Sequence, residues 1–215
     1  YTSDPLHGGF SPASLKIPTM VGTVIAEFGE VQDYGERSQL PVEEQERLVK
    51  EYYGEEGGQK ILDAFRKVYP NTPVIYATDL ENFFLADTVE YVKKKAAEAS
   101  APVYNYMFAK IFDYDGGRAA WHCADIPYFF HNARVMCGAF VNFAKTGDPN
   151  VEGLPRWEPC KDGKMLTMVF DNTCYVNENM QDELLPLVQQ YKPRFQFQGA
   201  TPEDEDGESG NAWVF

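Results

Sequence analysis

The feature that most constrains this chain is the alternation of strand-like segments with helical ones. Residues 17–25 form a short apolar run with β-branched side chains, and residues 103–112 form a second run rich in aromatic and β-branched residues. Residues 165–170 make a third, shorter run. Runs of this kind are typical of strands buried on both faces. We therefore expect three strands, the first of them fully buried.

Amphipathic helical patterns separate and follow these strands. They cover residues 41–54, 59–70, 79–100, 132–144 and 178–191. Pro70 ends the second pattern, and Thr78 and Asp79 are candidate caps for the third. Strands that alternate with helices in this way indicate an α/β domain with a mainly parallel sheet flanked by helices.

Composition excludes several classes of protein. A chain of 215 residues with 44% hydrophobic and 14% aromatic residues can bury a substantial core. The formal net charge of −14 would repel phosphate backbones and anionic lipid surfaces, so we expect neither a nucleic-acid nor a membrane partner. No apolar run approaches the roughly 18 residues that would span a bilayer. Residues 201–215 are acidic and contain glycine, which is typical of a solvated tail.

The number and spacing of the cysteines predict free thiols rather than a set of structural disulfide bonds. The chain has four of them, and none lies in a C-x-x-C pair. They are Cys123, Cys137, Cys160 and Cys174. Free thiols favour a reducing, cytoplasmic compartment, although the compartment itself stays open. Because no group of His, Cys and acidic residues has a recognised ligand spacing, we expect no metal site.

Two residues of chemical interest follow predicted strands. Glu27 comes directly after the first strand, and His122 lies in a loop after the second strand and a Gly-Gly turn. In open α/β sheets, ligands and catalytic groups gather at this carboxyl edge. Each residue also has an ordinary interpretation: Glu27 is one of 33 acidic residues, and a histidine is often a surface or core residue with a satisfied hydrogen bond. Together they are two members of a hydrolase triad in the order Ser, then Asp or Glu, then His.

Three sequence blocks resemble the type-B carboxylesterases and cholinesterases. In residues 20–30, MVGTVIAEFGE, Gly22 precedes Glu27 by the five positions that separate the family's glycine from its triad acid. Residues 121–132, WHCADIPYFFHN, resemble the family's histidine motif, with His122 as its histidine. Residues 140–157 resemble a third block, and PVYNYMF resembles the strand before the histidine loop. The matching positions of the third block are Phe143, Ala144, Gly147, Asp148, Pro149, Asn150 and Trp157.

The chain also departs from the family pattern. The family's Lys-Asp before the acid, often followed by Gly, is replaced here by Ile25-Ala26 before Glu27 and by Phe28 after it, which leaves Glu30 as a second candidate acid. A nucleophile elbow, Gly-x-Ser-x-Gly, is missing from the 215 residues. The nearest imitation surrounds Ser209, in the acidic tail, without the strand and helix that an elbow needs.

The resemblance implies that residues 1–200 are the carboxyl-terminal part of an α/β-hydrolase domain. It also implies a carboxylic ester hydrolase with His122 as general base, Glu27 as its acid partner and the serine upstream of Tyr1. Such an enzyme works through an acyl-enzyme and needs no metal or organic cofactor. The isolated chain would then be inactive, and its partners would be a small ester, the missing amino-terminal part and a second copy of itself. The alternative is a non-catalytic, cholinesterase-like module that binds another protein.

Overall fold

The computed structural model describes residues 4–28, 35–81, 84–113 and 116–192. Its main sheet has the strand order β1-β2-β5-β6. The strands are β1 (Thr19–Val24), β2 (Val103–Phe108), β5 (Leu166–Phe170) and β6 (Tyr175–Glu178). The first three run parallel, and β6 pairs antiparallel with β5. The mainly parallel sheet is therefore confirmed, and each of the three predicted segments contributes a strand to it.

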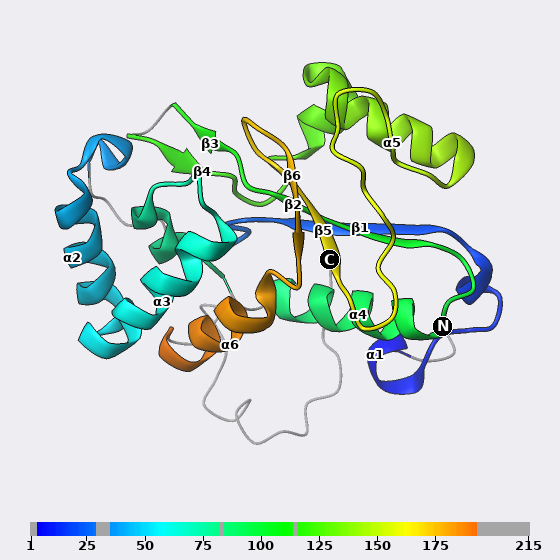
Figure 1. The fold of residues 1–215 in the computed structure, drawn as a ribbon, viewed down its shortest axis with the longest axis horizontal. Coiled ribbons are helices and arrows are strands. Elements are labelled where there is room, and N and C mark those ends of the chain that lie inside the picture. Colours follow the sequence, from blue (N-terminus) through cyan, green and yellow to red (C-terminus); the bar gives the residue numbers. More distant parts are fainter. Residues whose placement is uncertain (1–3, 29–34, 82–83, 114–115, 193–215) are drawn as a thin grey trace, which may run out of the picture.

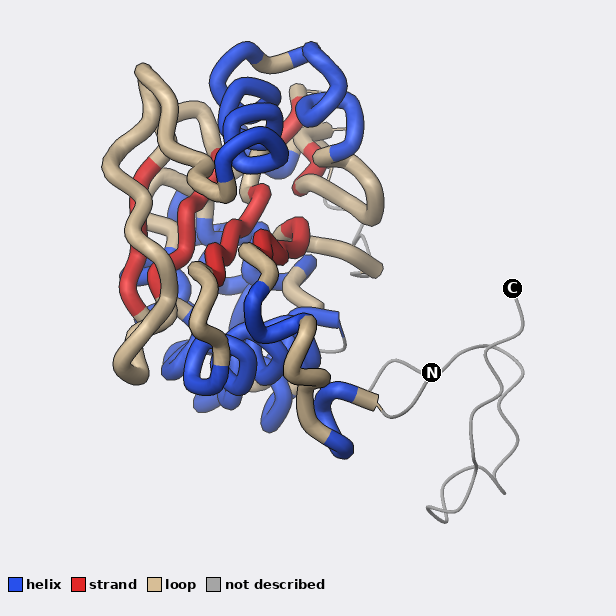
Figure 2. The backbone as a smooth tube through the Cα atoms, turned by 90° about the vertical axis from the view of Figure 1, so that its right-hand side faces the viewer, coloured by secondary structure: helices blue, strands red, loops and turns tan. Residues whose placement is uncertain are grey.

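Helices cover both faces of this sheet (Figure 1). The helix α5 (Arg134–Thr146) lies on one face, while α4 (Phe84–Glu98) and α6 (Gln181–Tyr191) lie on the other. Figure 2 shows the strands between these two layers of helices. The helices α2 (Val42–Tyr53) and α3 (Glu55–Val68) pack together beside α6. Short elements complete the described chain: α1 (Pro5–Gly8), η1 (Ser14–Lys16), η2 (Arg37–Gln39), η3 (Val74–Asp79), β3 (Ile111–Phe112), β4 (Arg118–Ala119) and the π-helical turn η4 (Tyr128–Asn132).

The second predicted strand is divided in the structure. Residues 103–112 were expected as one strand, but β2 ends at Phe108 and residues 111–112 form β3, which pairs with β4 in a separate hairpin. Both pieces have the same aromatic and β-branched composition, so the pattern along the chain does not mark the break. The hairpin carries the chain from the sheet toward the loop that holds His122.

Two further expectations need correction. The first strand is not fully buried, because β1 lies at one end of the described sheet and only Thr23 and Val24 in it are buried. The last helix does not begin at residue 178, because residues 175–178 form β6 and α6 starts at Gln181. Asn179, with a left-handed φ of 54°, makes the turn between them.

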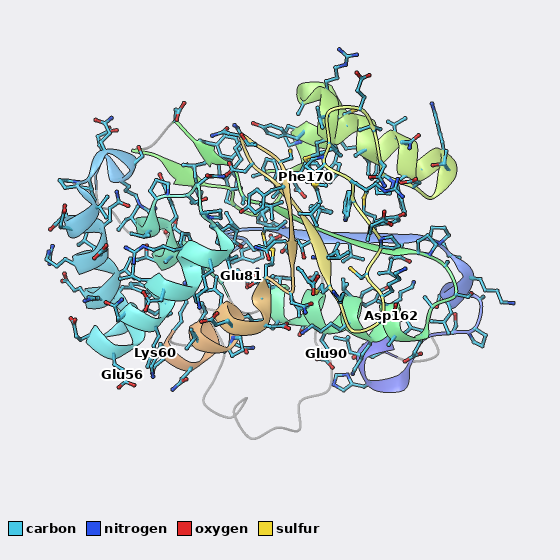
Figure 3. All side chains as sticks on the ribbon, in the orientation of Figure 1. Glu56, Lys60, Glu81, Glu90, Asp162 and Phe170 are labelled. Carbon is cyan, nitrogen blue, oxygen red and sulfur yellow. The ribbon has the colours of Figure 1, made fainter. Side chains whose placement is uncertain are left out.

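The start of α4 also differs from the expectation. Thr78 and Asp79 do not cap it but lie buried in η3, where Asp79 pairs with Arg37. The carboxylate of Glu81 accepts hydrogen bonds from the Phe84 and Leu85 N–H groups, at 3.0 and 2.8 Å, and so satisfies the first turn of α4. Figure 3 labels Glu81 beside this helix.

The helix α3 begins four residues before the predicted start and contains two glycines. A Cβ on Gly57 would lie 2.5 Å from the ring of Tyr191, and one on Gly58 would lie 2.5 Å from the backbone of Lys50. Glycine normally weakens a helix interior. Here the missing side chains let α2 and α6 approach α3 closely.

Candidate active site

Glu27 lies where β1 ends. The chain leaves the strand through Ile25, whose N–H donates to the Phe108 carbonyl, and Ala26, whose N–H donates to the Ala120 carbonyl. The Glu27 side chain then folds back, so that its Oε1 accepts a hydrogen bond from the Val24 N–H at 3.1 Å. This contact leaves the second carboxylate oxygen, Oε2, available for another donor.

That donor is the predicted histidine. His122 Nδ1 lies 2.7 Å from Glu27 Oε2, and the His122 N–H donates to the Glu27 carbonyl at 2.9 Å. An ionised carboxylate can only accept hydrogen bonds, so Nδ1 of the histidine carries the proton that Glu27 accepts. In the neutral ring, Nε2 is then the nitrogen that can take up a proton. The Glu27 side chain is 12% exposed and that of His122 51% exposed. The structure thus brings the two candidates together just beyond the carboxyl end of β1, with the imidazole half exposed.

The loop that carries His122 is fastened to the sheet by Tyr106. The Tyr106 hydroxyl donates to Asp125 Oδ2 at 2.9 Å, and Asp125 is itself buried. The Asp125 carbonyl accepts hydrogen bonds from the N–H groups of Tyr128 and Phe129. Burial raises the pKa of Tyr106 well above its ordinary value, so the hydroxyl keeps its proton and remains a donor.

Gly22 makes room for this tyrosine. Gly22 and Tyr106 face each other in the parallel pairing of β1 with β2, and a Cβ on Gly22 would lie 2.4 Å from the Tyr106 ring. No real side chain tolerates so short a contact without a shift. The glycine that the sequence pattern placed five residues before Glu27 therefore has a packing role, which sequence reasoning did not find.

The third sequence block holds the chain that leaves α5. Asn150 Oδ1 accepts from the Trp157 N–H at 2.8 Å, and Asn150 Nδ2 donates to the Trp157 carbonyl at 2.9 Å. Asp148 Oδ1 accepts from both nitrogens of Asn150, which lowers the pKa of the Asp148 carboxyl. Trp157 is fully buried. These residues are structural supports at a distance from His122 and Glu27 in the fold.

Several other candidates receive no structural support. Glu30 and Ser209, together with residues 201–215, lie outside the described residues. All four cysteines have free thiols, as predicted, and Cys123 is exposed next to His122. Within the described ranges, no group of three or more His, Cys, Asp and Glu side chains could hold a metal ion. In that same part of the chain, no helix combines the length and apolarity needed to cross a bilayer.

The arrangement described above defines a class: an α/β fold with an acid and a hydrogen-bonded histidine at the carboxyl edge of a mainly parallel sheet. The sequence model of the carboxylesterase family matches residues 9–186. The chain belongs to the carboxylesterase family.

Solved structures agree with this assignment. An esterase from Clostridium hathewayi, described as able to hydrolyse aliphatic aromatic polyesters, is 30% identical with a TM-score of 0.82 over 89% of this chain. A PNB esterase, 21% identical with a TM-score of 0.50 over 80% of this chain, shares the fold. The chain spans 41% and 38% of the lengths of these two structures. A comparison with curated proteins finds no match.

Proposed function

We propose that this chain supplies the acid and the base of a carboxylic ester hydrolase. The observation that carries the proposal is the 2.7 Å contact between His122 Nδ1 and Glu27 Oε2 at the carboxyl edge of the sheet. Membership of the carboxylesterase family supports it. The nucleophile is a serine outside these 215 residues, in a longer polypeptide.

In the proposed reaction, His122 Nε2 takes the proton of the serine hydroxyl as the oxygen attacks the ester carbonyl. The imidazolium then gives that proton to the departing alcohol, which leaves an acyl-enzyme. A water molecule loses its proton to Nε2, attacks the acyl carbon and releases the acid, and the proton returns to the serine. Glu27 holds Nδ1–H throughout, so that Nε2 faces the reacting atoms, and it stabilises the imidazolium.

The experiment compares the 215-residue chain with the longer protein. A fluorophosphonate probe, which reacts with activated serines, labels the longer protein and leaves the isolated chain unlabelled. In the longer protein, His122→Ala lowers kcat on a p-nitrophenyl ester by at least about a thousandfold, since both the base and the acid are lost. His7→Ala is the matched control, because His7 pairs with Asp4 in an exposed helical turn and has no part in the mechanism.

Two results would refute the proposal. Labelling of Ser209 in the isolated chain would place the nucleophile within these residues. A longer protein that carries an unreactive residue in place of the serine, and that keeps its binding to another protein after His122→Ala, would identify the non-catalytic module.

We also propose that the rest of the hydrolase is the physical partner of this chain. The support is apolar surface on and beside α5, where Phe130 is 74% exposed and Phe140 and Val141 are 39% and 40% exposed. The strand β1 lies at the end of the described sheet and offers an edge for pairing. Light scattering of the isolated chain should show self-association that disappears in the longer protein. A monomeric isolated chain contradicts this proposal.

A further inference from the structure

One face of the His122 imidazole is covered by aromatic rings. Phe28, which directly follows Glu27, stacks on the imidazole with 4.5 Å between ring centroids and 25° between planes. The ring of Phe84 lies 5.3 Å from that of Phe28, and it is 6.3 Å from the imidazole at an angle of 26°. The Phe28 and Phe84 planes are tilted by 36° to each other, and each lies within 26° of the imidazole plane. The rings of Phe28, Phe84 and His122 form one cluster, which we call the aromatic shelf.

The aromatic shelf is attached to the helix α4 through Phe84. Phe84 is in the first turn of α4, and Glu81 accepts hydrogen bonds from the N–H groups of Phe84 and Leu85. A carboxylate at this position is stabilised by the helix dipole as well as by these bonds. Glu81 is buried, so the cap is held by the surrounding core. Phe28 is 41% exposed, and its contact with Phe84 is what connects it to this fixed turn.

A hydrogen bond and a stacked ring restrict different motions of an imidazole. The contact between His122 Nδ1 and Glu27 Oε2 sets the position of Nδ1 but permits the ring to rotate about that contact. Such a rotation would move Nε2 away from a reacting hydroxyl. A flat ring against the imidazole face opposes the rotation, and it also interacts favourably with the imidazolium, which is cationic.

We propose that Phe28 is a positioning residue that, supported by Phe84, keeps the His122 imidazole in the plane where Nε2 can reach the nucleophile. The inference rests on the proposed function, because it assigns the shelf a part in proton transfer. Phe28 stands where the resembling family often has glycine, so the shelf depends on a side chain that this family pattern does not supply.

The first test measures the contact in the 215-residue chain by proton NMR. The chain has only three histidines, so imidazole signals can be assigned with His7→Ala and His122→Ala. The ring current of Phe28 shifts the carbon-bound imidazole protons of His122 upfield. Phe28→Leu should move them downfield toward those of His7, and Phe28→Tyr should keep them in place. Phe10→Leu is the matched control, since the Phe10 ring packs edge-on against Tyr91 and takes no part in the contact with His122.

The second test measures turnover in the longer protein. Phe28→Leu should lower kcat about three- to tenfold and change KM less than twofold, as expected for loss of one aromatic contact that orients the base. Phe28→Tyr should keep kcat near that of the unaltered protein, and Phe10→Leu should leave kcat unchanged.

The outcomes separate the two proposals. If Phe28→Leu leaves the His122 signals in place, the stacking is wrong, whatever the protein catalyses. If the signals move while kcat stays the same, Phe28 packs against His122 but does not position it, and the inference is overturned. If the signals move and the unaltered longer protein hydrolyses no ester, the proposed function fails and the catalytic part of the inference fails with it.

Discussion

Two pairs of an acidic and a basic side chain in this molecule differ in their exposure to solvent. Arg37 and Asp79 are buried, with side chains 2% and 1% exposed, and make two hydrogen bonds of 2.9 and 2.7 Å. His122 and Glu27 make a single side-chain contact of 2.7 Å, with the histidine 51% exposed. The first pair can serve only the fold, because no reactant reaches it. The pair of His122 and Glu27 leaves the histidine accessible to solvent, and we expect it to contribute little to the free energy of unfolding.

The surroundings of each pair explain the difference. Arg37 also lies over the Tyr76 ring, and its N–H donates to the Gly116 carbonyl, so it connects η2, η3 and the turn before β4. Burial raises the pKa of the Asp79 carboxyl, and the guanidinium opposes that rise. His122 is connected to the sheet indirectly, through Asp125 and Tyr106. We therefore expect substitutions in the buried pair to lower stability strongly, and substitutions in the pair of His122 and Glu27 to lower it little while lowering kcat.

The largest effect on stability is expected when the buried pair loses one member. Arg37→Met leaves Asp79 buried without its cation and should lower the free energy of unfolding by about 3–5 kcal/mol. Urea denaturation of the chain, followed by circular dichroism, measures the change. The double variant Arg37→Met with Asp79→Leu should recover much of the loss, because no buried charge remains.

The control for this prediction is an exposed pair. Glu56 and Lys60 lie on the outer side of α3 (Figure 3), 2.6 Å apart and 78% and 48% exposed. Glu56→Gln should leave the denaturation midpoint nearly unchanged. If Glu56→Gln and Arg37→Met have equal effects, the contrast between the buried and the exposed pairs is refuted.

An intermediate effect is expected at the contact that anchors the histidine loop. Gly22→Ala places a Cβ about where the Tyr106 ring lies and should cost about 1–3 kcal/mol in unfolding free energy. Gly138→Ala is the matched control, because Gly138 is in α5 and its nearest neighbour atom would be 3.8 Å away. That change should be neutral or stabilising by up to about 1 kcal/mol. Equal loss of stability in both variants would contradict the packing role of Gly22.

The smallest effect on stability is expected at the candidate catalytic pair. Glu27→Gln keeps an acceptor for the Val24 N–H and should change the free energy of unfolding by at most about 1 kcal/mol, because the His122 side chain is half exposed. The same variant should lower kcat of the longer protein by about a hundredfold or more, since an amide neither enforces the histidine tautomer nor stabilises the imidazolium. A variant that loses stability and keeps kcat would show that Glu27 supports the fold instead.

The two candidate residues that the structure brings together were predictable from the sequence, but the residues packed around them were not. Glu27 and His122 were identified because each follows a strand and lies in a recognisable block. Phe28 was taken only as a departure from the family pattern, since no local pattern reveals that its ring will stack on a histidine. Asp79 was assigned to a helix cap because its position before a helix is the usual signal for one. Its actual partner, Arg37, is 42 positions earlier in the chain.

The sequence by itself determined the alternation of strands and helices, the mainly parallel sheet and the order in which acid and histidine follow their strands. These properties depend on the local periodicity of apolar residues and on motifs a few residues long. Only the tertiary structure decided that β6 joins the sheet edge, that Gly22 faces Tyr106, and that Phe28 stacks on His122. Such contacts depend on strand order, register and side-chain direction, which are set when distant segments pack together and leave no trace in the local pattern.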